Sequence, residues 1–203
     1  MHALGGYERL VQEVKGRENP DIPITFGLLI ADYRQQNCKD YILNYIERFD
    51  YVSGKYINFY LPGYLKNEHL ITDNKISIKG IKYYFDEDVY MDFLYKLEQD
   101  FDIEYPYNPV LILLEYSSGN FRFSKNIRIE LDVEGADIRK TGELFDEIFK
   151  IAQKNVAIED YSQNLINMSM KNGLLDTIIS GINISYISAI HNQNQEVKKY
   201  KIR

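Results

Sequence analysis

The chain has 203 residues, of which 45% are hydrophobic, and a formal net charge of -6 at neutral pH. This length fits one domain with extensions, and its core needs no disulfide or metal to hold it. The acidic balance disfavours a nucleic-acid partner, because sequence-independent binders carry a basic face. The sequence holds no run of about 20 apolar residues, so we expect neither a membrane-spanning helix nor a membrane partner.

Hydrophobic periodicity and turn residues predict the main elements. In chain order they are a short helix within 1–22, a strand over 24–31, a helix over 38–51, a strand over 56–61, a ribbon or ordered loop around 76–81, a helix from Asp86 or Asp88 to Phe101, a strand over 110–116, a return strand over 121–133 and a helix over 138–154. The first of these strands is almost continuously apolar, which is typical of a strand covered on both faces. The return strand alternates at period two, which predicts one wet face.

The chain divides into an N-terminal extension (1–22), an α/β domain (23–154) and a C-terminal helical extension (155–203). In the last part we expect a helix over 159–171, while 181–190 has the pattern of a final strand. Apolar residues also recur there at helical spacing: Leu174, Leu175, Ile178, Ile179 and Ile182. Such a stripe packs either on its own domain, which we favour, or on a second copy, which would make the chain a homo-oligomer.

The order β-α-β-α-β-β-α over 23–154 resembles that of the thioredoxin-like fold. Pro109 stands directly before the third strand, where members of that superfamily carry a cis-proline. Residues 32–39 (DYRQQNCK) stand where the family has its Cys-x-x-Cys-Lys turn. The resemblance implies a three-layer α/β sandwich, with a candidate site near 32–38, Pro62-Gly63 and Pro109.

The resemblance departs at the residues that carry the family's chemistry. Gln35 occupies the place of the nucleophilic cysteine, and only Cys38 has a counterpart. Dithiol exchange needs one thiolate to attack and a second thiol to resolve the mixed disulfide. The resemblance therefore implies a scaffold without that activity. The insert 62–85 is a further departure from a minimal member.

Cys38 is the only cysteine, so an internal disulfide cannot form, and we expect a reducing, cytoplasmic location. It lies at a predicted helix N-terminus beside Lys39, and both features lower a thiol pKa. One-cysteine redox chemistry with an external thiol is one interpretation, and a buried packing cysteine is the other.

Acidic residues at predicted strand ends form the second candidate site. They are Asp32, Glu115, Glu130, Asp132 and Glu134. Two or three converging carboxylates can hold Mg²⁺ for phosphoester chemistry, and here Asp32 would act with Glu115 or Asp132. The alternative is that the last three acids form the wet face of one strand.

The third candidate is an anion or nucleotide-phosphate site at the same helix N-terminus. Arg34 and Lys39 flank it, with Gln35 and Asn37 between them. Ordinary helix capping is the alternative. The three histidines, His2, His69 and His191, are scattered and do not have zinc spacing. A Glu68-His69 acid–base pair competes with a solvated loop.

Taken together, these patterns predict a non-enzymatic protein-interaction or ligand-binding module on a redox-inactive thioredoxin-like scaffold, with a protein partner and no cofactor. The alternative is a metal-dependent enzyme that acts on nucleotides or phosphoesters. Tyrosine occurs 18 times and tryptophan is absent. Genomic base composition explains this bias, and a Tyr-rich contact surface is the competing interpretation.

Overall fold

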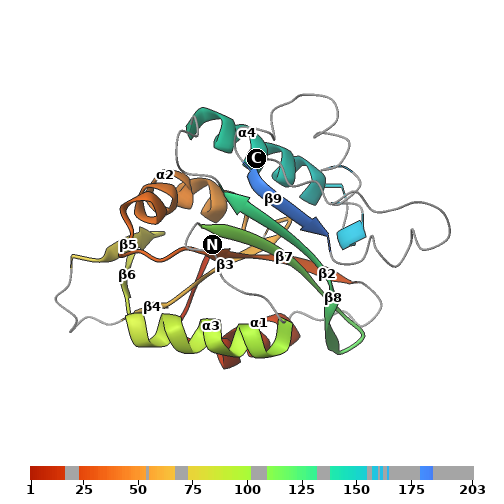
Figure 1. Ribbon diagram of the computed structural model, residues 1–203, viewed down its shortest axis with the longest axis horizontal. Helices are drawn as coiled ribbons and strands as arrows, with labels where there is room; N and C mark the ends of the chain where they lie inside the picture. Colours follow the sequence, from red (N-terminus) through yellow and green to blue (C-terminus); the bar gives the residue numbers. More distant parts are fainter. Residues whose placement is uncertain are drawn as a thin grey trace.

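The computed structural model has helices on both faces of a central sheet, together with a smaller second sheet (Figure 1). It describes residues 1–16, 23–53, 55–66, 73–101, 109–131, 138–154, 157–159, 161, 164 and 179–184. The strands are β1 His2–Leu4, β2 Ile24–Ile30, β3 Asn58–Pro62, β4 Tyr64–Leu65, β5 Lys75–Ile78, β6 Ile81–Phe85, β7 Val110–Ser117, β8 Asn120–Leu131 and β9 Ile179–Ile184. The helices are α1 Tyr7–Lys15, α2 Gln36–Val52, α3 Glu87–Phe101 and α4 Ile138–Ala152.

The larger sheet has the strand order β1-β3-β2-β7-β8-β9. Strand β3 is parallel to both β1 and β2, which the crossover helices allow. Strand β7 runs antiparallel to β2, and β8 and β9 continue the antiparallel pairing. Strands β7 and β8 form a hairpin whose tip, Ser118-Gly119, has positive φ at both residues, as a tight two-residue turn requires.

Helices α1 and α3 cover one face of this sheet, and α2 and α4 cover the other (Figure 1). The core between the sheet, α2 and α4 is aromatic. Phe59 of β3 packs at 4.9 Å, ring centre to ring centre, from Phe49 of α2 and at 5.6 Å from Phe149 of α4. Gly27 pairs with Phe59, and a Cβ at Gly27 would lie 2.5 Å from that ring. The glycine therefore makes room for the central ring of the core.

The insert between β3 and α3 folds into the second sheet, with the order β4-β6-β5. Its hairpin turns at Lys79-Gly80, where both residues have positive φ. Strand β5 packs against α2, and the Lys79 ammonium lies 3.4 Å from the Asp50 carboxylate near the end of that helix. The insert, expected as a ribbon or loop around 76–81, is thus a sheet that lies against α2.

The α/β class and the order of elements in 23–154 are confirmed, with differences at the boundaries. The sequence analysis misses one element, and one of its expectations needs correction. Strand β1 is not predicted, because three residues are too few to show a period. The helical stripe of the C-terminal extension is wrong at Ile179 and Ile182, because both lie in strand β9. The rest of the stripe, most of the expected helix over 159–171 and the tail after 184 lie outside the described residues.

Candidate functional site

The site expected around 32–39 lies where β2 ends and α2 begins. Val110 pairs with Ile30, so Pro109, which is buried, comes to the same end of the sheet. The sequence predicts this position of Pro109, because the residue directly precedes the strand that pairs with β2. The described residues contain no cis peptide bond, and Asn108, on the other side of the Pro109 peptide, is outside them.

Arg34 joins the two elements that border this site. Its guanidinium makes three hydrogen bonds to the Asp32 carboxylate, at 2.9, 3.1 and 2.5 Å. Its remaining terminal nitrogen pairs with Glu87, the first residue of α3. The Arg34 backbone N–H also donates to Asp32 at 3.0 Å. One guanidinium therefore fastens the start of α2 to the start of α3.

The charge of Asp32 is stabilised by this neighbour. Partial burial raises the pKa of Asp32, but hydrogen bonds from the side chain and backbone of Arg34, together with its positive charge, outweigh that effect. The net pKa lies below the usual range for an aspartate. Asp32 is consequently a paired anion at neutral pH and lacks the properties of a free general base.

Cys38 is buried, with 1% of its surface exposed. Burial raises the pKa of its thiol to about 11; a backbone hydrogen bond with Asp32 opposes this shift and the Asp32 charge adds to it. The sequence-based expectation of a lowered thiol pKa is therefore wrong, because desolvation outweighs the helix N-terminus and Lys39. The geometry agrees with the interpretation of Cys38 as a packing residue.

An aromatic cluster lies beneath the start of α2. Tyr33 forms an edge contact with Tyr64 of β4, with ring centres 6.1 Å apart, and stacks on Phe85 of β6 at 6.2 Å. Tyr90 of α3 adds a fourth ring, 5.3 Å from Phe85. The Tyr33 hydroxyl donates to the Lys75 carbonyl at 3.2 Å. Rings from the turn after β2, from the second sheet and from α3 therefore pack together.

Tyr64 is the unusual member of the cluster. It is 1% exposed, and its hydroxyl finds no hydrogen-bond partner in the described part of the chain. Burial raises the pKa of Tyr64 well above its ordinary value, and the nearby Tyr33, Tyr90 and Asp32 add to the shift. The hydroxyl therefore stays protonated and neutral.

Of the other predicted binding residues, Gln35 and Lys39 differ in the contacts that they make. Gln35 is the N-cap residue of α2 but makes no capping hydrogen bond with its side chain, so the capping interpretation is not met by Gln35. The Lys39 ammonium lies over the Tyr33 ring, 5.1 Å from its centre. Asn37 lies in the first turn of α2, and its side chain is not among those described.

The predicted carboxylates do not converge as a single site. Glu115 pairs with Thr25 at the far end of β2, about 20 Å along the strand from Asp32. A metal shared by Asp32 and Glu115 is therefore excluded, because a metal shell spans only a few ångströms. Glu130 lies on β8 beside Val110, with its side chain not described, and Asp132 and Glu134 lie outside the described residues. Among the residues described, no group of three metal-ligating side chains is found.

Glu115 instead has a structural role that the sequence does not reveal. Its side chain is buried, and it accepts hydrogen bonds from the Ile158 N–H at 3.3 Å and the Ser117 hydroxyl at 3.4 Å. It therefore holds the segment after α4 against β7. Only the odd position of a carboxylate inside an apolar strand could have indicated such a role.

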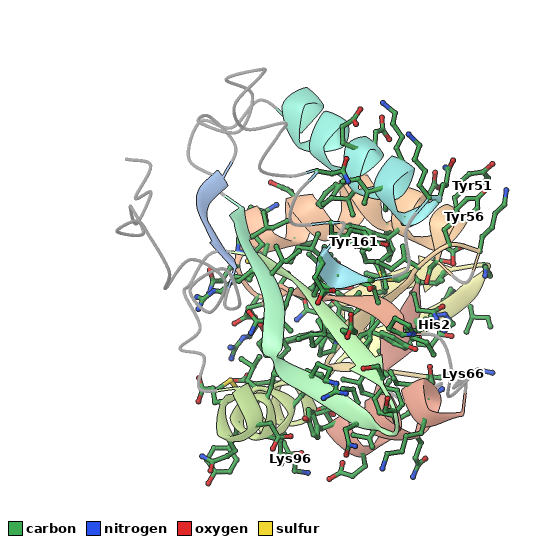
Figure 2. The ribbon with its side chains drawn as sticks, turned by 90° about the vertical axis from the view of Figure 1, so that its right-hand side faces the viewer. His2, Tyr51, Tyr56, Lys66, Lys96 and Tyr161 are labelled. Atoms are coloured by element: carbon green, nitrogen blue, oxygen red, sulfur yellow. The ribbon has the colours of Figure 1, made fainter. Side chains whose placement is uncertain are left out.

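The histidines and the tyrosines are the remaining candidates from the sequence. His2 lies on β1, with its ring 5.2 Å from Tyr60 and its Nδ1 3.8 Å from Glu13 (Figure 2). Glu68, His69 and His191 lie outside the described residues. Most described tyrosines are buried or half-buried, and the clearly exposed ones are Tyr51, Tyr56 and Tyr95. Among the described tyrosines, therefore, most belong to the interior and few are available for a contact surface.

Comparison with known proteins adds no family. No protein-family model matches the chain, and neither the curated proteins nor the solved structures contain a match. Within the residues described, no helix has the length and apolar character needed to cross a membrane.

Proposed function

We propose that this chain is a redox-inactive domain on a thioredoxin-like scaffold that acts as a protein-interaction or ligand-binding module. The strand order supports the scaffold. The element order β-α-β-α-β-β-α predicts a parallel pair of early strands and a later antiparallel hairpin in the same sheet. Strands β2 and β3 are parallel, and β7 and β8 form an antiparallel hairpin that continues the sheet from β2.

Helix placement also supports the scaffold. Right-handed crossovers put successive helices of a parallel unit on defined faces of the sheet. Here α2 and α4 lie on one face and α3 on the other, with α1 and β1 as an N-terminal addition beside β3 (Figure 1). The insert between β3 and α3 is the main addition to the minimal pattern.

The burial of Cys38 is the single observation that carries the proposed loss of redox activity. Where the scaffold would have an exposed, low-pKa thiol, this chain has Gln35, and its one cysteine is buried with a raised pKa. A protonated thiol is a poor nucleophile, and no second cysteine exists to resolve a mixed disulfide. A lone buried thiol also fits the reducing cytoplasm, which we propose as the location.

The redox part of the proposal is tested by a disulfide-reduction assay with dithiothreitol and a disulfide-bonded protein substrate. The chain should not accelerate reduction above the rate with dithiothreitol alone, and Cys38→Ala should behave like the wild type. Acceleration that disappears in Cys38→Ala would establish one-cysteine redox chemistry and overturn this part of the proposal.

The binding part is tested by affinity capture from an extract of the source cells, followed by reconstitution with each purified candidate. We expect a partner or ligand that binds the purified wild type and Cys38→Ala equally, because the thiol has no role in binding. A chain that stays monomeric and binds no purified candidate would contradict the binding function, whatever the redox assay shows.

A further inference from the structure

The outward side of α3 carries an apolar pair between acidic residues. Met91 and Tyr95 are 50% and 62% exposed, which makes them two of the most exposed large apolar side chains in the described part of the chain. Asp88, Asp92 and Glu98 are exposed on the same side. These five positions recur at helical spacing and therefore form one continuous surface, which we call the α3 ridge.

The opposite side of α3 accounts for its attachment to the domain. Tyr90, Phe93 and Leu97 are buried against the rest of the domain. Tyr7 of α1 packs on Phe93 with ring centres 5.6 Å apart, and this pair joins the two helices of that layer. The fold therefore needs neither Met91 nor Tyr95 for its core, and the exposure of both is not explained by packing.

The charge of the ridge is only partly neutralised. Lys96 is the single cation of α3, and it pairs with Glu8 of α1 at 2.6 Å and with Asp92 at 3.0 Å (Figure 2). Within the described residues no ion pair is found for Asp88 or Glu98. A segment that covers the ridge should therefore bring positive charge to both ends and an apolar group to the middle.

The chain itself contains a segment with that composition. Residues 197–203 (VKKYKIR) hold four cations and no acidic side chain, interleaved with Val197, Tyr200 and Ile202. This composition contrasts with the net charge of -6 of the whole chain. The segment is thus complementary to the ridge in both charge and apolar character.

The length of chain before this segment is sufficient to reach α3. Strand β9 ends at Ile184, and the residues between it and Val197 can span about 40 Å when extended. That reach exceeds twice the radius of gyration of a domain of this length, about 16 Å. The tail can therefore pass from the edge of the sheet to the α1–α3 layer.

We propose that the α3 ridge is a docking surface for a basic segment with apolar anchors, and that residues 197–203 of the same chain occupy it. Any external partner of the ridge would then share this chemistry and compete with the tail. The proposal depends neither on the thioredoxin-like scaffold nor on the absence of redox activity.

Disulfide trapping in the full-length chain tests the proposal directly. A Cys38→Ala background removes the native thiol, and Gln99→Cys beside the ridge is combined with Gln195→Cys just before the basic segment. The matched control combines Tyr51→Cys with Gln195→Cys. Tyr51 is 79% exposed and belongs to α2, on the other side of the sheet from the Lys96 side chain of α3 (Figure 2).

We expect the ridge pair to cross-link within the monomer about tenfold faster than the control pair, because docking raises the effective concentration of the two thiols. Adding Asp88→Lys with Glu98→Lys should bring the rate down to that of the control, as should 1 M salt. Both residues are exposed, so circular dichroism should show an unchanged fold.

Three results would overturn the proposal. Equal rates for the two cysteine pairs would mean that the tail has no preferred place. A rate unaffected by the charge reversals would remove the electrostatic basis. Cross-linking that yields only covalent dimers would identify a second copy as the occupant in place of the same chain.

Discussion

Arg34 connects two parts of the chain through one guanidinium group. Replacing it with alanine removes the hydrogen bonds to Asp32 and the pair with Glu87. The exposed Glu87 pair contributes little, but the charge-assisted bonds to the partly buried Asp32 contribute more. We expect Arg34→Ala to lower the free energy of unfolding by about 1–2 kcal/mol in urea titrations at pH 7.

A matched control and a pH dependence accompany this prediction. Arg9→Ala removes an exposed pair with Glu13 within α1, so it should change stability by less than about 0.5 kcal/mol. The folded pKa of Asp32 lies below its unfolded value of about 3.9. Its contribution is therefore complete above that value and disappears as the pH falls through the lowered folded pKa. An Arg34→Ala effect that persists undiminished at the acid end would contradict the assigned pairing.

Tyr64 and Tyr33 offer a contrast between two hydroxyls in one cluster. The Tyr33 hydroxyl donates to the Lys75 carbonyl, whereas the Tyr64 hydroxyl is buried without a partner among the described residues. We expect Tyr33→Phe to cost about 0.5–1.5 kcal/mol of unfolding free energy and Tyr64→Phe to be neutral or stabilising. Chemical denaturation of both variants measures this difference. A larger loss for Tyr64→Phe would mean that its hydroxyl is bound.

Gly63 determines how the second sheet joins the first. It has φ of +85°, and an added Cβ would lie 2.7 Å from the Cβ of Tyr90 on α3. We expect Gly63→Ala to destabilise the chain by about 2 kcal/mol or more, from backbone strain and the clash together. Gly119→Ala is the control, because Gly119 has φ of +79° and open space around it. Its loss should be about 1 kcal/mol, so equal losses in thermal unfolding would refute the contact at Gly63.

At the level of elements, sequence patterns predict the helices and strands that are long enough to show a pattern. Strand β7 has a long apolar run and helix α3 has a clear helical period, and both are present close to their expected bounds. Strands β1 and β4 have three and two residues, which is too short for a pattern, and pairing with distant strands forms them. Ile179 and Ile182 have helical spacing in the sequence, but both form a strand because they pair with the distant strand β8.

The candidate site is predictable in location but not in chemistry. Chain order alone brings Pro109 beside the end of β2. Besides Asp32, Arg34 pairs with Glu87, and no local pattern in the sequence connects these two residues. Cys38 is likewise buried, with 1% of its surface exposed, and no local pattern in the sequence determines that burial. Effects that depend on tertiary packing are thus the ones that sequence reasoning misassigns.

At the scale of the whole molecule, the insert adds a second sheet that packs next to the end of β2 and against α2. The sheet β4-β6-β5 contributes Tyr64 and Phe85 to the cluster beneath α2, and its hairpin reaches the end of that helix through Lys79. The turn that follows β2 therefore contributes Tyr33 to a packed aromatic cluster. The α3 ridge, proposed above as a docking surface, consists of other residues than this cluster.

Alkylation of Cys38 by iodoacetamide across a pH range is the most direct test of this account. The chain has one thiol, so the signal has a single source. We predict far slower reaction in the native chain than in the urea-unfolded chain, with a native pH midpoint near 11. Rapid native alkylation with a midpoint below about 8.5, the value of a free thiol, would contradict the burial of Cys38 and the proposed absence of redox activity.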